Sequence, residues 1–115
     1  MRTRIGIVSA AFIILWIVLQ SLVDRMLYYP MRYPQGDWTA QRASGAEDVW
    51  LRTQDGVRLN AWFFSHPNAP FVTLFLHGNA GNVTHRIDHA QAVRHAGSAI
   101  LVLDYRGYGL CLLSY

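Results

Sequence analysis

The hydrophobic pattern divides the chain into one long apolar block at its N-terminus and several shorter apolar runs after it. The block extends from Ile5 to Val23 without a charged residue. As an α-helix rising about 1.5 Å per residue, it would span about 28 Å, close to the hydrocarbon thickness of a bilayer. The pattern predicts a transmembrane segment over residues 1–23, through which the chain contacts the membrane.

The residues that flank this block favour an anchor over a cleaved signal peptide. Both have a basic start, which Arg2 and Arg4 supply here, but no small-x-small cleavage site follows Val23. We therefore expect an uncleaved signal anchor in a single-pass membrane protein. Arg2 and Arg4 favour a cytoplasmic N-terminus, although Arg25 and Arg32 on the far side reduce the asymmetry. The rest of the chain is then expected on the opposite side of the membrane.

After the block, residues 24–46 lack any regular hydrophobic period. Prolines and glycines interrupt the segment at Pro30, Pro34, Gly36 and Gly45. Such residues mark turns and irregular structure. We therefore expect a tether over 24–46, followed by a folded domain over 47–115.

The first half of this domain has the pattern of a β-hairpin. Two alternating apolar runs, 49–53 and 57–64, flank Asp55-Gly56. An Asp-Gly pair between such runs favours a tight turn, because glycine readily takes a positive φ. The tryptophan and phenylalanine side chains of the hairpin are expected in the core.

The second half has the pattern of a βαβ unit. Continuous apolar runs at 71–76 and 99–103 are typical of strands buried in a parallel sheet. Between them, a helix is predicted from about Thr84, as its N-cap, to Ala96, with Gly97 ending it. Its most apolar face carries Ile87, Ala90, Val93 and Ala96. The sequence therefore predicts an α/β fold behind a transmembrane helix.

Composition and charge exclude several functions. The formal net charge of +3 comes from arginines alone, and these are scattered singly, which argues against nucleic-acid binding. One cysteine, Cys111, excludes an internal disulfide. His85 and His89 have a metal-chelating spacing but lack a third ligand, so a solvated helix face is the expected role. No cofactor, metal or specific protein partner is predicted.

The glycine-rich segment His77-Gly-Asn-Ala-Gly-Asn82 is the strongest chemical signal. A glycine turn between a buried strand and a helix directs backbone N–H groups to one point, which stabilises negative charge. A phosphate cradle would need a Lys-Ser/Thr pair or a G-x-G-x-x-G spacing, and neither is present. An oxyanion hole remains. Asn82-Val-Thr84 is also a glycosylation sequon, but a helix cap explains these residues more simply.

The segments LFLHGNAGN and LDYRGYG together resemble the third and fourth strands of the α/β-hydrolases, in particular a membrane-anchored serine hydrolase branch. The resemblance covers the N-terminal part of that fold and implies the strand order 1-2-4-3. It also implies that the backbone N–H of Asn79 binds the oxyanion, with His77, Gly78 and Gly81 as the supporting loop and His77 in a structural role. Intact relatives are expected to hydrolyse an ester or amide of a small acyl substrate.

The chain departs from that family in lacking the G-x-S-x-G nucleophile elbow, the acid and the triad histidine. We therefore expect a truncated α/β-hydrolase domain with no triad residue and no activity. Cys111 is a weak substitute nucleophile, because no second glycine follows it. The alternative is a non-catalytic, membrane-tethered interaction module that binds a partner through an open sheet edge. An edge strand at 71–76 and one uncovered sheet face are expected in either case.

Overall fold

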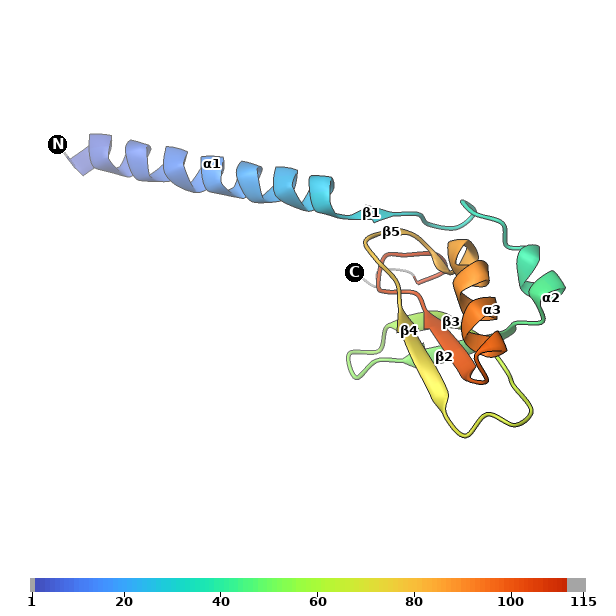
Figure 1. Ribbon diagram of the computed structural model, residues 1–115. Helices are drawn as coiled ribbons and strands as arrows, with labels where there is room; N and C mark the ends of the chain where they lie inside the picture. Colours follow the sequence, from blue (N-terminus) through green and yellow to red (C-terminus); the bar gives the residue numbers. More distant parts are fainter. Residues whose placement is uncertain (1, 112–115) are drawn as a thin grey trace.

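The computed structural model describes residues 2–111 and consists of one long helix joined to a four-stranded sheet with helices on one side (Figure 1). Helix α1, Arg2–Leu27, projects away from the sheet domain. Met1 and residues 112–115, which include the end of the predicted domain, lie outside the described residues.

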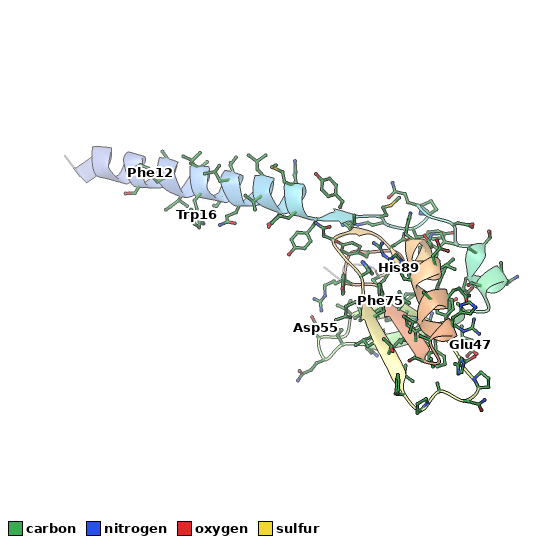
Figure 2. All side chains as sticks on the ribbon, viewed as in Figure 1. Phe12, Trp16, Glu47, Asp55, Phe75 and His89 are labelled. Carbon is green, nitrogen blue, oxygen red and sulfur yellow. The ribbon has the colours of Figure 1, made fainter. Side chains whose placement is uncertain are left out.

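Helix α1 is long and apolar enough to cross a membrane. Over Ser9–Leu27 its mean hydropathy is 1.8, and none of that window is buried in the protein. The side chains of Phe12 and Trp16 point outward from the helix and are exposed (Figure 2). The helix ends four residues beyond Val23, the expected end of the apolar segment.

The sheet has the expected strands and the expected order. Its strands are β2 (Glu47–Arg52), β3 (Arg58–Phe64), β4 (Val72–Leu76) and β6 (Ala99–Leu103), in the order β2-β3-β6-β4. Strands β2 and β3 form the antiparallel hairpin, and Gly56 turns the chain with a φ of +87°. The mixed sheet and its connections confirm the predicted fold class.

Strands β4 and β6 are parallel, and the connection between them contains two helical segments. Such connections are right-handed almost without exception. The two segments are the 3₁₀ segment η1 (Val83–Arg86) and helix α3 (Ile87–His95). Ala90 of α3 is fully buried, and Ile87 and Val93 pack against the same core. Gly97 follows with a φ of +92°, so the predicted stop is confirmed. The predicted face is confirmed for these three residues, but Ala96, its fourth member, is the exposed C-cap after α3.

The core lies between α3 and one face of the sheet. Trp62 and Phe64 of β3 and Ile100 and Val102 of β6 are almost fully buried there. One part of the core prediction is wrong, because Trp50 on the outer strand β2 is 42% exposed. An edge strand has neighbours on one side only, and the ring of Trp50 is instead covered by the guanidinium of Arg58, 4.4 Å from its centroid.

The opposite face of the sheet is open over β4. Val72, Leu74 and Leu76 all point to this face and are each more than half exposed. Strand β4 is also an edge of the sheet. The expected open edge and uncovered face are therefore both present among the described residues.

The segment predicted as a tether contains regular structure and contacts the domain. Its strand β1 (Tyr29–Pro30) pairs in parallel with β5 (Ala80–Gly81), which lies inside the glycine-rich loop. A short helix, α2 (Ala40–Ser44), follows. The boundaries of the three predicted regions stay predictions.

Asn82 holds this segment against the start of η1. Its side-chain amide donates to the carbonyls of Met31, at 3.1 Å, and Gln35, at 2.9 Å. Its side-chain oxygen accepts from the backbone N–H of Thr84 at 3.1 Å. Asn82, not Thr84, is therefore the N-cap, and the sequence prediction was wrong by two residues. Asn82 is fully buried with both amide hydrogens used, which leaves no room for a glycan.

Candidate active site

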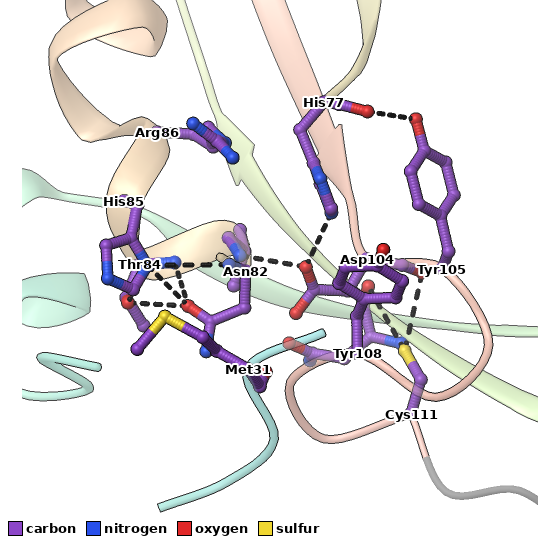
Figure 3. Close-up of polar contacts among 12 residues, drawn as sticks. Met31, His77, Asn82, Thr84, His85, Arg86, Asp104, Tyr105, Tyr108 and Cys111 are labelled. Atoms are coloured by element: carbon purple, nitrogen blue, oxygen red, sulfur yellow. Dashed lines mark hydrogen bonds and ion pairs between the residues drawn. The ribbon is translucent and has the colours of Figure 1, made fainter. Parts of the chain in front are cut away.

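The candidate site lies where β4 and β6 end at the same edge of the sheet. Leu76 and Leu103 are register partners, so His77 and Asp104 follow them as neighbours. Nε2 of His77 lies 3.1 Å from Oδ1 of Asp104, and both side chains are fully buried (Figure 3). This pair joins the two loops that the sequence identified as HGNAGN and DYRGYG.

The second ring nitrogen of His77, Nδ1, holds the peptide bond between Gly78 and Asn79. Nδ1 lies 2.7 Å from the carbonyl oxygen of Gly78. Because a carbonyl only accepts hydrogen bonds, Nδ1 carries the hydrogen of this contact. Asp104 is held in turn by the backbone N–H of Val83, which donates to its Oδ1 at 2.8 Å. The Gly78–Asn79 peptide is thus tied through the imidazole to a buried carboxylate.

Asn79 is fixed by three further contacts. Its carbonyl oxygen accepts from the backbone N–H of Tyr29 at 2.9 Å and from the hydroxyl of Tyr108 at 2.8 Å. Its side-chain amide donates to the carbonyl of Leu27, the last residue of α1. The backbone N–H of Asn79 has no hydrogen-bond partner among the described residues.

Two tyrosines enclose the imidazole. The ring centroid of Tyr105 lies 4.5 Å from that of His77, and the centroid of Tyr108 lies 5.2 Å away. The hydroxyl of Tyr105 donates to the carbonyl of His77 at 2.6 Å. Burial raises the pKa of Tyr108, so its hydroxyl remains a donor at physiological pH.

Glycine at position 109 allows the second loop to close over Asp104. Gly109 has a φ of +47°, and a Cβ there would lie 1.9 Å from Oδ2 of Asp104. The loop then bonds to the segment after α1, because the N–H of Gly109 donates to Met31 and its carbonyl accepts from Tyr33, both at 2.9 Å. The segment at 29–33 therefore contacts both loops of the site.

These elements surround a cavity of about 490 Å³. Three of the four loop residues singled out from the sequence line it, namely His77, Gly78 and Asn79, whereas Gly81 pairs with Pro30 in the β1–β5 ladder. Sequence reasoning missed the other lining residues, which are Tyr28, Pro30, Arg32, Tyr105, Arg106, Gly107 and Tyr108.

One signal would have found the contact of His77 with Asp104. Both residues directly follow apolar strands of one βαβ unit, and the carboxyl ends of parallel strands meet at one edge. Asp104 was not among the site residues predicted from the sequence. The contribution of residues 28–32 had no such signal, because it depends on how the chain turns back after α1.

The remaining candidates have structural contacts. Nδ1 of His85 lies 3.1 Å from the side-chain oxygen of Asn82, and the ring of His89 lies beside Phe75, with centroids 5.7 Å apart. No cluster of metal-ligating side chains occurs among the described residues. Sγ of Cys111 is buried and accepts from the backbone N–H of Asn60 at 3.0 Å.

Several known proteins are similar to this chain in sequence. Protein Rv2307c of Mycobacterium tuberculosis is 35% identical over 106 residues, which are 90% of this chain and 36% of that protein. The α/β hydrolase domain-containing protein WAV2 of Arabidopsis thaliana is 42% identical over 67 residues, or 55% of this chain and 21% of WAV2. The membrane protein YNL320W of Saccharomyces cerevisiae is 36% identical over 64 residues, which are 55% of this chain and 22% of YNL320W. No protein-family model matches the chain.

A solved structure gives the same result for the fold. The esterase Pf2001 of Pyrococcus furiosus superposes with a TM-score of 0.58 and 25% sequence identity, over 76% of this chain and 35% of the esterase. The chain belongs to the α/β-hydrolase superfamily and corresponds to the N-terminal part of its fold. It spans about a third of the length of relatives such as Rv2307c and Pf2001.

The buried environment of Cys111 predicts that its thiol reacts slowly with alkylating agents. Burial raises its pKa to about 11, so at pH 8 the thiolate fraction is about 200-fold lower than for a free cysteine with a pKa near 8.5. We expect iodoacetamide to alkylate Cys111 at least that much more slowly than a cysteine peptide. The rate should rise about tenfold per pH unit until the pH approaches the pKa of the thiol. Alkylation at pH 8 as fast as that of the peptide would contradict this burial.

Proposed function

We propose that this chain supplies the membrane anchor and the first oxyanion donor of an acyl hydrolase. The observation that carries the proposal is that Asn79 lines the cavity while its backbone N–H has no hydrogen-bond partner among the described residues. Ester or amide hydrolysis by the whole protein is part of the proposal. The superfamily assignment and the esterase similarity support it.

Preorganisation supports this role for Asn79. An oxyanion donor lowers the barrier most when its direction is fixed before charge develops, because no reorganisation is then needed. Here the peptide on one side of Asn79 is held by His77 through Gly78, and the carbonyl on the other side is held by Tyr108. The N–H is constrained from both ends.

Within these 115 residues no serine lies in a G-x-S-x-G elbow, and Cys111 is buried. An acyl-enzyme needs an activated nucleophile. We therefore propose that the 115-residue polypeptide alone binds a tetrahedral anion without turning over an ester.

The length and composition of α1 support an anchoring role. We propose that it crosses the bilayer once, with Arg2 and Arg4 on the cytoplasmic side and the sheet domain on the other. The similarity to a yeast membrane protein supports a membrane location.

A non-catalytic interaction module is the second candidate. The open edge and exposed side chains of β4 favour it, since an unpaired edge strand can bind another chain by β-augmentation. The two candidates differ at Asn79, whose N–H has a function only in the first.

Binding of methyl butylphosphonate, a soluble mimic of the tetrahedral intermediate, tests the oxyanion role. In the ¹⁵N-labelled chain in detergent micelles, we expect a saturable downfield shift of the Asn79 amide proton, with no change at exposed Asn68. Asn79→Ala keeps the N–H and should keep the affinity. Asn79→Pro removes the donor and should weaken binding about tenfold or more, as expected for a hydrogen bond to a charged group.

Two results would contradict this role. One is equal affinity of the alanine and proline variants, provided that both retain the dispersed amide spectrum of the folded chain. The other is hydrolysis of 4-nitrophenyl butyrate by the purified chain well above the rate in micelles alone.

Membrane insertion predicts two outcomes in a bacterial expression host. The chain should stay in the membrane pellet after an alkaline carbonate wash, because an apolar helix of this length is not extracted. Trypsin added to intact spheroplasts should cleave after the arginines of the sheet domain. A chain released by carbonate would exclude the anchor, and cleavage only after lysis would reverse the orientation.

A further inference from the structure

The cavity begins where the candidate membrane span ends. Leu27 is the last residue of α1 and of that span, and Tyr28, the next residue, lines the cavity. Asn79 is tied to the same point, because its side-chain amide donates to the Leu27 carbonyl. The proposed oxyanion donor is thus attached directly to the end of the membrane helix.

This placement puts Tyr28 and Pro30, two residues of the cavity lining, close to the bilayer interface. The interfacial layer on each side of the hydrocarbon core is about 5–8 Å thick. Tyr28 and Pro30 lie one and three residues after the span, which is within about 10 Å even for an extended chain. Lipid ester groups lie in the same layer, between the acyl chains and the headgroups. Tyrosine is also the residue type enriched there.

A free cation lines the same cavity. Nε of Arg32 donates to the carbonyl of Gly107 at 3.3 Å, and within residues 2–111 Arg32 has no carboxylate partner. Arg106, also in the lining, differs because its guanidinium is paired with Asp55 at 2.7 Å. Arg32 is thus the cation in the lining that can bind an anionic group such as a phosphate.

We propose that the ligand of this cavity is an acyl ester of a bilayer lipid with an anionic phosphate headgroup. Its ester carbonyl faces the N–H of Asn79, and its phosphate contacts Arg32. This inference rests on the proposed oxyanion role of Asn79. It adds the source of the ester, which is the membrane and not the surrounding water.

Photo-crosslinking in nanodiscs tests the inference. The full chain is inserted into nanodiscs that contain phosphatidylglycerol or phosphatidylcholine with a diazirine close to the acyl carbonyl, and crosslinks are assigned by peptide fragmentation. Tyr28 contacts lipid in any case, so the informative residues are Tyr105 and Tyr108, far from α1 in the sequence. We expect both to be labelled, about fivefold more by the phosphatidylglycerol probe, as expected for one cation near the surface.

Arg32→Gln should bring the labelling ratio of the two lipids at Tyr108 close to one. Arg25→Gln is the matched control, because Arg25 lies at the same end of α1 but outside the cavity lining, and it should leave the ratio unchanged. Exposed Leu74 on β4 reports non-specific contact with lipid. Labelling of Leu74 as strong as that of Tyr105 and Tyr108 would overturn the inference.

The phosphonate titration separates this inference from the proposal on which it rests. A saturable shift of the Asn79 amide without lipid labelling of Tyr105 and Tyr108 would retain the oxyanion role and exclude a membrane-borne ester. If neither the amide shift nor the lipid labelling is seen, both the oxyanion role of Asn79 and the membrane-borne ester are excluded. Equal loss of labelling in Arg32→Gln and Arg25→Gln would remove the specific role of Arg32.

Discussion

The buried contact between His77 and Asp104 is the interaction on which the rest of the site depends. It joins the ends of two neighbouring parallel strands, and each partner holds a further piece of backbone. Asp104 fixes the start of η1 through Val83, and His77 fixes the peptide before Asn79. Breaking a buried pair leaves a charge or polar group without a partner, which costs several kcal/mol. The direction of the Asn79 N–H therefore depends on a carboxylate in the other loop.

The segment after α1 is the third component of this arrangement. It pairs with the glycine-rich loop at Ala80–Gly81 and bonds to Gly109 in the other loop. Gly36 lies so close to the start of η1 that a Cβ there would be 2.2 Å from the Thr84 hydroxyl oxygen. The helix end, the cavity and the two loops thus form one connected unit.

Pattern and turn chemistry were sufficient to predict most of the fold, because each run of apolar residues has only a few ways to be buried. Two errors came from tertiary context. Trp50 is apolar but lies on an edge strand, where burial depends on a neighbour that periodicity does not reveal. The N-cap is Asn82 and not Thr84 because the Asn82 side-chain oxygen accepts from the backbone N–H of Thr84, in an orientation held by the hydrogen bonds of its amide to Met31 and Gln35. The cavity lining after Leu27 also depends on contacts between residues distant in sequence.

Urea unfolding of Asp104→Ala, followed by tryptophan fluorescence in micelles, tests the central role of the buried pair most directly. Asp88→Ala is the matched control, since Asp88 is exposed on α3. We expect Asp104→Ala to lower the free energy of unfolding by about 3 kcal/mol, and Asp88→Ala to change it by less than about 0.5 kcal/mol. Equal, small effects of the two substitutions would contradict the role assigned to the contact of His77 with Asp104.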